Sequence, residues 1–152
     1  MTNELALDRQ VCFALYSASR ATTAVYRPML DELGVTYPQY LVLLVLWEKD
    51  GRGVKEICAE LDLDTGTLSP MLKRLGGLGF IERRRLSTDE RRVEIHLTET
   101  GSAMRAKALD LPRKLAEKTG MGVDDLVRLK ESLDALTSAL HHTDSRTTEG
   151  ES

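Results

Sequence analysis

The sequence has few cysteines and no long apolar run. Two cysteines, Cys12 and Cys58, among 152 residues are too few for a disulfide framework, and we expect both to be free thiols in a reducing compartment. No apolar run approaches the roughly 18 residues of a membrane span. The first ten residues, MTNELALDRQ, are acidic and polar, without the apolar segment of a signal peptide. The sequence therefore predicts a single cytoplasmic domain with no membrane partner.

Histidine is also scarce, which argues against a metal site. Of the three histidines, His96 falls on an expected strand, whereas His141 and His142 are adjacent and far from it in sequence. These residues need not converge on one ion, so we predict no metal and no other cofactor.

Positive charge is concentrated in one segment of an otherwise acidic chain. The twenty residues from Lys73 to Arg92 contain seven basic and three acidic side chains, a net charge of +4. Because the whole chain carries −3, the remainder carries −7. A localised basic segment is typical of a nucleic-acid contact, although a solvated charged surface gives the same pattern.

The N-terminal half predicts three helical stretches. Apolar spacing predicts a helix over residues 4–26, which Pro28 kinks or interrupts. Thr36 and Gln39 form a capping-box pattern before a helix over residues 37–49 that is apolar nearly all round and therefore buried. The sequence Asp50-Gly51 closes that helix.

Two short helices follow, and the second has a polar outer face. They are expected over residues 54–61 and 65–76, with Asp64 or Thr65 capping the second. An inner stripe of leucines leaves Gly66, Thr67, Ser69, Pro70, Lys73 and Arg74 outside. A helix, a tight polar turn and a helix with a polar face are typical of a helix-turn-helix. Pro70 either bends this helix to tune its fit to a groove or is a simple irregularity.

An arginine-rich hairpin follows the second helix. Phe80 to Leu86 and the alternating residues Val93, Ile95 and Leu97 predict two strands, joined by the turn Ser87-Thr88-Asp89-Glu90. The hairpin carries arginines at positions 83, 84, 85, 91 and 92. A helix-turn-helix followed by such a hairpin is a winged helix, whose helix reads the major groove and whose wing inserts an arginine into the minor groove. Asp89 would fix the direction of the Arg91 guanidinium.

The C-terminal part predicts two more helices and a tail. One helix begins at Thr98 and extends to about Lys118, and the other extends from about Val123 to His141. Leucines in the last helix recur at spacings of three and four, a coiled-coil-like seam that faces either the chain's own core or a second chain. The tail over residues 142–152 has no large apolar residue, and we predict it to be disordered. The fold class is mainly α with a small β-hairpin.

Two long segments resemble a known family. One segment is similar to the DNA-binding core of the MarR family, including its wing signature: TGTLSPMLKRLGGLGFIERRRLSTDERRVEIHLTETG. A second segment resembles the OhrR-type subgroup, the repressors that sense organic hydroperoxides: CFALYSASRATTAVYRPMLDELGVTYPQYLVLLVLWE. The resemblance covers residues 10–140.

The resemblance implies a homodimer on double-stranded DNA with a pseudo-palindromic operator. Helices at residues 4–34 and 98–141 would form the dimer interface, and residues 37–97 the winged helix-turn-helix. The candidate DNA-binding residues are Thr65, Thr67, Ser69, Pro70, Lys73, Arg74, Arg85, Asp89, Arg91 and Arg92.

Cys12 is either a small buried hydrophobe or a redox sensor. The resemblance favours a sensor whose thiol accepts hydrogen bonds from Tyr26 and Tyr37. Cys12 and Tyr26 are fourteen residues apart, about 21 Å along one helix, so they would meet only between two antiparallel chains. With the helix starting at residue 4, Cys12 lies in its second or third turn, where the helix dipole contributes little.

The expected chemistry is oxidation of Cys12 by an organic hydroperoxide to a sulfenic acid, followed by a mixed disulfide with an external low-molecular-weight thiol. Some members of the subgroup supply a second cysteine near the start of the last helix, and residues 116–121 here contain none. Cys58, Tyr16 and Tyr40 are expected to be structural.

Three other functions compete with the redox-sensing repressor. One is a MarR-type regulator released by a small phenolic or acidic ligand, with Cys12 a bystander. Another is a thiol peroxidase, which would need a resolving thiol that the sequence does not show, so we predict that the chain is not an enzyme. A purely structural coiled-coil protein would not need the arginine hairpin.

Overall fold

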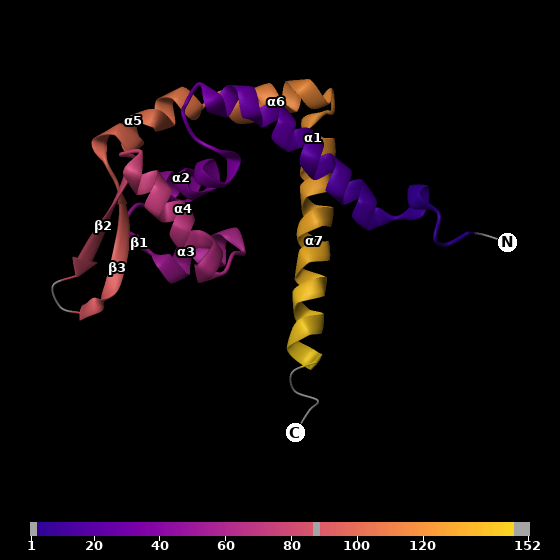
Figure 1. The fold of residues 1–152 in the computed structure, drawn as a ribbon. Helices are drawn as coiled ribbons and strands as arrows, with labels where there is room; N and C mark the ends of the chain where they lie inside the picture. Colours follow the sequence, from indigo (N-terminus) through magenta and orange to yellow (C-terminus); the bar gives the residue numbers. More distant parts are fainter. Residues whose placement is uncertain (1–2, 87–88, 148–152) are drawn as a thin grey trace. The chain divides into compact units, whose positions relative to one another are not determined.

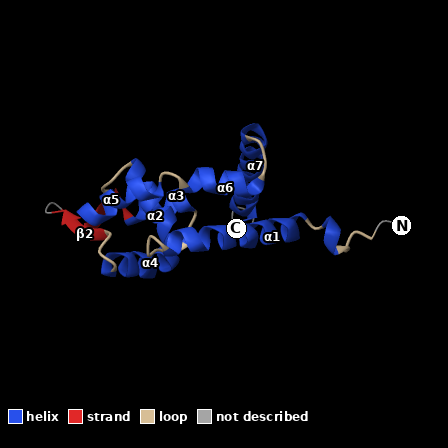
Figure 2. Ribbon diagram, turned by 90° about the horizontal axis from the view of Figure 1, so that it is seen from above, coloured by secondary structure: helices blue, strands red, loops and turns tan. Residues whose placement is uncertain are grey.

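The computed structural model describes residues 3–86 and 89–147, and side chains are described except at residues 89–91 and 143–147. It is mainly helical with one small sheet (Figures 1 and 2). The chain divides into two compact units, Met1–Leu111 and Pro112–Ser152, which we describe separately. The observed class, mainly α with a small antiparallel sheet, confirms the predicted fold class. The assignment of one domain with dimerisation helices at both ends stays a prediction.

The first unit begins with a short 3₁₀ helix, Leu7–Arg9, and the long helix α1, Val11–Asp31. The predicted start at residue 4 is therefore wrong. Gln10 has an extended backbone, and its side-chain amide donates to the carbonyl oxygens of Glu4 and Ala6, which separates the two helices. Of the two predicted effects of Pro28, a kink or an interruption, the interruption is wrong, because α1 continues through this residue. Buried side chains at Tyr26 and Leu30, on either side of Pro28, hold this part of the helix against the core.

Helix α2, Tyr37–Glu48, is the centre of the core. The predicted capping box is present, since the Thr36 hydroxyl accepts from the Gln39 backbone N–H at 3.4 Å and the Gln39 side chain accepts from the Thr36 N–H at 2.9 Å. Val42, Leu43 and Leu46 are almost fully inaccessible to solvent, which confirms that this helix is buried.

Helices α3, Val54–Leu61, and α4, Thr65–Gly77, pack against α2 in the same lobe (Figure 1). Asp62 ends α3 in the left-handed conformation at φ 54°, which makes the turn between the helices tight. The Asp64 carboxylate accepts from the Thr67 N–H at 2.6 Å and caps α4, as the sequence predicts. Both helices therefore lie where the helix-turn-helix pattern requires.

The sheet has three antiparallel strands in the order β1-β3-β2, not the two predicted. Strands β2, Ile81–Leu86, and β3, Asp89–Leu97, form the predicted hairpin, and β1, Arg52–Gly53, adds to the other edge of β3. The Arg52 guanidinium secures this edge, since Nε donates to the Lys49 carbonyl at 3.1 Å and Nη1 lies 3.1 Å from Glu60 Oε1. The sheet therefore ties the wing to the turn after α2.

The predicted helix over 98–118 is two helices, α5, Glu99–Ala108, and α6, Leu111–Thr119. Pro112 lacks the N–H that would bond to the Ala108 carbonyl in a continuous helix, which explains the break. In the second unit, α7 covers Val123–Thr147. The predicted boundary of a disordered tail at residue 142 is therefore too early, and residues 148–152 lie outside the described part of the chain.

None of the described helices is both long enough and apolar enough to span a membrane.

Candidate nucleic-acid interface and redox site

Three tyrosines form a cluster where α1 meets α2. The ring centroids of Tyr26 and Tyr37 are 5.0 Å apart, and Tyr40 lies 5.8 Å from Tyr26 and 6.2 Å from Tyr37. Tyr40 also meets Trp47 edge-on at 6.3 Å, which links the cluster to the core. The structure thus brings two predicted sensor residues together, and it adds Tyr40, which sequence spacing placed nearby without a functional role.

Burial controls the ionisation of this cluster. Tyr26 is 8% exposed, and burial, together with the negative charge that Tyr40 and Tyr37 would carry when ionised, raises its pKa to about 12. Burial, with Tyr37 as the smaller cause, also raises the pKa of Tyr40. The phenol of Tyr26 therefore keeps its proton at neutral pH and is available as a hydrogen-bond donor.

Cys12 is exposed, and the structure does not bring it to the tyrosines within one chain. It is the second residue of α1, fourteen residues before Tyr26 on the same helix, a separation of about 21 Å. The premise of that dipole prediction, a helix start at residue 4, is wrong, because the helix begins at Val11. Cys12 therefore lies in the first turn, where backbone N–H groups have no partner within the helix.

Cys58 and Tyr16 occupy other surroundings. Cys58 is half-buried on α3, with its Sγ 4.0 Å from the Thr65 hydroxyl, so it packs at the turn between α3 and α4. Tyr16 is exposed on α1, and the guanidinium of Arg20 lies 5.5 Å from its ring centroid.

The outer face of α4 has the composition that the sequence predicts. Leu68, Leu72 and Leu75 are buried against the lobe. Five of the six candidate residues on this helix are exposed and Ser69 is half-buried; the exposed residues are Thr65, Thr67, Pro70, Lys73 and Arg74. Pro70 lies inside α4 without ending it. The helix therefore presents hydroxyls and two cations on one side and its leucines on the other.

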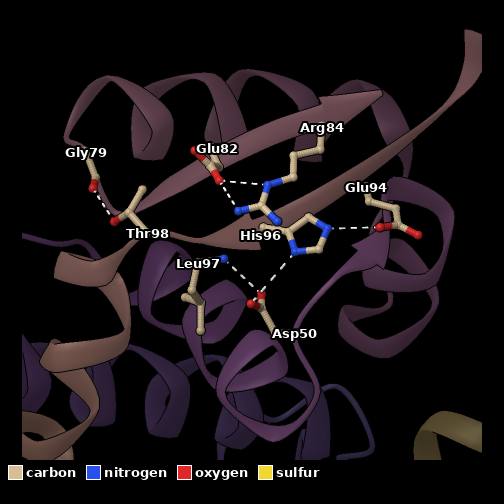
Figure 3. Close-up of polar contacts among 8 residues, drawn as sticks. All are labelled: Asp50, Gly79, Glu82, Arg84, Glu94, His96, Leu97 and Thr98. Atoms are coloured by element: carbon tan, nitrogen blue, oxygen red, sulfur yellow. Dashed lines mark hydrogen bonds and ion pairs between the residues drawn. The ribbon is translucent and has the colours of Figure 1, made fainter. Parts of the chain in front are cut away.

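The hairpin carries most of its charge outward. Arg83, Arg85 and Arg92 are exposed, whereas Arg84 donates to the Glu82 carboxylate through Nε at 2.8 Å and forms an ion pair with it (Figure 3). The register is regular up to an irregularity between Arg85 and Leu86. The side chains of the remaining two candidates, Asp89 and Arg91, lie outside the described residues.

A cavity of about 720 Å³ lies between α3, α4 and the hairpin. Basic side chains from three elements, Lys55, Arg83 and Arg92, line it together with Thr65 and Ser69 of α4. No local pattern in the sequence indicates this cavity, because its lining, which includes Glu56 and Glu94, comes from residues up to 41 positions apart that only the sheet brings together.

His96 lies on the same sheet between two carboxylates. Its Nε2 is 2.9 Å from a Glu94 oxygen, and its Nδ1 is 3.9 Å from Asp50, whose other oxygen accepts from the Leu97 N–H at 2.8 Å (Figure 3). Within the described residues, no group of three or more His, Cys, Asp or Glu side chains is arranged to hold a metal ion.

A capped helix-turn-helix, a polar outer face on its second helix and an arginine-bearing hairpin define a winged-helix DNA-binding protein. Residues 24–107 match the family described as the transcriptional regulator SarA/Rot. The chain belongs to this MarR-like family of winged-helix transcriptional regulators, and it is therefore a DNA-binding regulator.

Three relatives show the extent of the similarity. The chain is 45% identical over 139 residues to the organic hydroperoxide resistance transcriptional regulator of Bacillus subtilis (strain 168), covering 91% of this chain and 95% of that protein. It is 47% identical over 135 residues to the HTH-type transcriptional regulator TtmR of Methylorubrum extorquens (strain PA1), covering 89% and 69%. A structure of reduced AbfR bound to DNA matches with a TM-score of 0.77 at 33% identity, covering 90% and 94%. These similarities confirm the predicted resemblance to the MarR family and its hydroperoxide-resistance branch.

Proposed function

We propose that this chain is a homodimeric repressor that senses organic hydroperoxides through Cys12 and then releases its operator. One observation carries the proposal: an exposed cysteine lies in the first turn of α1, and the buried, protonated Tyr26 lies in the C-terminal half of the same helix, against Tyr37 of α2. Two chains packed antiparallel along α1 would bring the thiol of one to the phenols of the other. The similarity to the Bacillus subtilis regulator supports this reading.

Exposed apolar residues support a dimer. In a single chain, Leu7, Val11, Phe13 and Tyr16 on the 3₁₀ helix and the start of α1 are between 44% and 65% exposed. The last helix adds a second exposed set, comprising Val123, Val127, Leu129, Leu133, Leu136 and Leu140. Exposed apolar surface of this extent is typical of a protein–protein contact, so a second copy of the chain is the expected cover. The predicted seam on α7 would then face the other chain.

The redox step follows from thiol chemistry. The Cys12 thiolate attacks the outer oxygen of the hydroperoxide, an S–O bond forms, the O–O bond breaks, and the alcohol leaves with a proton. The resulting sulfenic acid reacts with an external thiol to give a mixed disulfide and water. Two phenol donors beside the sulfur favour its thiolate form, and the bulky adduct would displace the tyrosines from it.

The change in shape would then reach the DNA. A dimer of winged helices binds two half-sites about one helical turn apart, so a shift of a few ångströms between the lobes spoils the fit. The proposed DNA contacts lie on α4 and on the wing. They are Thr65, Thr67, Ser69, Pro70, Lys73 and Arg74 of α4, and Arg85, Asp89, Arg91 and Arg92 of the wing. AbfR has been solved on DNA in a reduced and in an overoxidized form, which supports a redox-linked regulator. The cytoplasm, where the DNA lies, is the expected location.

A second candidate is release by a small acidic ligand, for which the cavity of about 720 Å³ offers Lys55, Arg83 and Arg92 beside the carboxylates of Glu56 and Glu94. The two functions are separated by measuring operator binding before and after one equivalent of cumene hydroperoxide plus cysteine, for the wild type and for Cys12→Ser, with mass spectrometry of Cys12. Release by the wild type alone, with an adduct on Cys12, supports the proposal. Binding by both proteins after oxidation contradicts it and favours the ligand-released regulator.

A further inference from the structure

A small cavity lies beside the tyrosine cluster, between the C-terminal half of α1 and the start of α2. Its volume is about 230 Å³. Leu30 and Val35 are buried and form its apolar part, and the remaining lining is Thr23, Arg27, Asp31, Thr36, Tyr37 and Pro38. Pockets for drug-sized ligands are larger, about 300–1,000 Å³. The size of this cavity therefore suits a fragment no larger than one amino acid.

The charges on the wall of the cavity come in a complementary pair. Thr23, Arg27 and Asp31 follow one another at intervals of four residues on α1, so they share one face of the helix. Within the described residues, no ion pair engages Arg27 or Asp31. A simple carboxylate would meet Arg27 but would be repelled by Asp31. An α-amino-acid head group satisfies both, because its carboxylate pairs with the guanidinium and its ammonium pairs with the carboxylate.

Tyr37 connects this cavity to the proposed sensor. It lines the cavity, and its ring lies 5.0 Å from that of Tyr26. A small molecule held by Arg27 and Asp31 would therefore lie next to the phenols that, in the proposed dimer, surround Cys12 of the second chain.

We propose that this cavity binds the amino-acid head group of the thiol that caps oxidised Cys12, and so selects cysteine-like thiols. This inference rests on the proposed function and specifies its second step. The thiolate of the bound thiol attacks the sulfur of the Cys12 sulfenic acid, an S–S bond forms and the S–O bond breaks. The departing hydroxide takes the proton released by the incoming thiol and becomes water, so no further oxidant or reductant is needed.

The test compares four small thiols that carry different combinations of an ammonium and a carboxylate. Cysteine carries both, 3-mercaptopropionate lacks the ammonium, cysteamine lacks the carboxylate and 2-mercaptoethanol lacks both. Cys12 is first oxidised with one equivalent of cumene hydroperoxide, dimedone trapping confirms the sulfenic acid, and quenched samples give the rate of adduct formation by mass spectrometry. Each rate is compared between the wild type and a variant, which cancels the intrinsic reactivity of the thiol.

We expect Arg27→Gln to slow the reactions of cysteine and 3-mercaptopropionate about tenfold and to leave cysteamine and 2-mercaptoethanol unchanged. Asp31→Asn should slow cysteine and cysteamine about tenfold and should not slow 3-mercaptopropionate. Arg105→Gln on α5 and Glu32→Gln beside α1 make the same changes in net charge outside the cavity, and both should leave all four rates unchanged.

Two kinds of failure are distinguishable. If the hydroperoxide produces no sulfenic acid on Cys12, the proposed function itself is overturned, and this inference with it. In the second case the sulfenic acid forms, but each thiol reacts at the same rate with the wild type as with Arg27→Gln and Asp31→Asn. The redox function then stands, and the cavity is not a thiol site. Because both side chains are exposed and unpaired in the described structure, these variants are expected to fold.

Discussion

The ring of Tyr26 lies against the ring of Tyr37, with centroids 5.0 Å apart and planes inclined by 44°. The contact joins the C-terminal half of the long first helix to the first residue of α2, and Tyr26 has only 8% of its surface in water. A phenol in such a position is costly to ionise, because the anion would lose its hydration. The pKa of Tyr26 is accordingly raised to about 12.

The raised pKa predicts how stability changes in alkali. An unfolded tyrosine loses its proton near pH 10 and folded Tyr26 near pH 12, so the unfolded state gives up this proton first. The stabilisation is fully present below about pH 10 and is lost as the pH rises from about 10 towards 12. Denaturant unfolding between pH 8 and 11 should therefore show a steeper loss for the wild type than for Tyr26→Phe. Equal slopes for the two proteins would contradict the burial of the phenol, and Tyr16→Phe, at an exposed tyrosine, is the control.

Gly101 predicts a second measurable effect, because it lies against the backbone of Phe80, in the turn between α4 and β2. A Cβ at this position would lie 2.0 Å from the carbonyl oxygen of Phe80, and backbone cannot rotate away as a side chain does. The Gly101 carbonyl also accepts from the Trp47 indole N–H at 2.9 Å, so a shift of α5 would break a contact with α2. We expect Gly101→Ala to lower the free energy of unfolding by about 1–3 kcal/mol.

Gly77→Ala is the matched control for this prediction. Gly77 lies at the end of α4, and a Cβ there would meet no atom within 4 Å. Alanine in a helix is more favourable than glycine, so this variant should be unchanged or up to about 1 kcal/mol more stable. Urea unfolding of the two variants and the wild type measures both effects. A Gly101→Ala variant as stable as Gly77→Ala would refute the close approach to Phe80.

Local signals explain why much of the fold could be predicted from the sequence. The structure agrees with the predicted range Val54–Leu61 for α3. It also agrees with the caps at Thr36, Asp64 and Thr98, because each cap depends only on a polar side chain and a backbone donor three residues away. The polar face of α4 follows from the spacing of its three leucines alone. These features need no information from distant parts of the chain.

Features that depend on distant contacts were missed. Strand β1 contains two residues, Arg52 and Gly53, whose conformation comes from pairing with Ile95 and Glu94, so no local pattern indicates it. The continuation of α1 through Pro28 depends on the burial of Tyr26 and Leu30. The cavity of about 720 Å³ is lined by residues from Gly53 to Glu94, which only the folded sheet brings together.

Thr98 makes two hydrogen bonds that predict the effect of removing its hydroxyl. The hydroxyl accepts from the Gly101 N–H at 3.1 Å to cap α5. It also donates to the Gly79 carbonyl at 2.6 Å, the bond drawn in Figure 3. Thr98→Ala should therefore cost about 1–2 kcal/mol of stability. Thr98→Ser keeps the hydroxyl and should recover most of that loss in the same denaturant experiment. If serine is no better than alanine, the methyl group and not the hydroxyl matters.

The last prediction concerns DNA binding and compares basic side chains that have no ion pair within the described residues with one that has an ion pair. Lys73 on α4 and Arg92 on β3 are exposed, with no ion pair within the described residues, whereas Arg84 is engaged by Glu82. A cation that neutralises a phosphate releases a counterion, so its removal weakens binding and lowers the slope of log affinity against log salt by about one. We expect this decrease for Lys73→Ala and for Arg92→Ala, measured by operator titration between 50 and 200 mM salt.

Arg84→Ala is the matched control, because it removes one positive charge from the same hairpin. Its guanidinium already faces a carboxylate, so its removal should change the slope much less than the removal of Lys73 or Arg92. If all three variants lose the same slope, only the net charge of the lobe matters and the proposed contacts are wrong. If Lys73→Ala also weakens binding to unrelated DNA by the same factor, Lys73 contacts phosphates, because a residue that reads base edges would lose affinity for the operator alone.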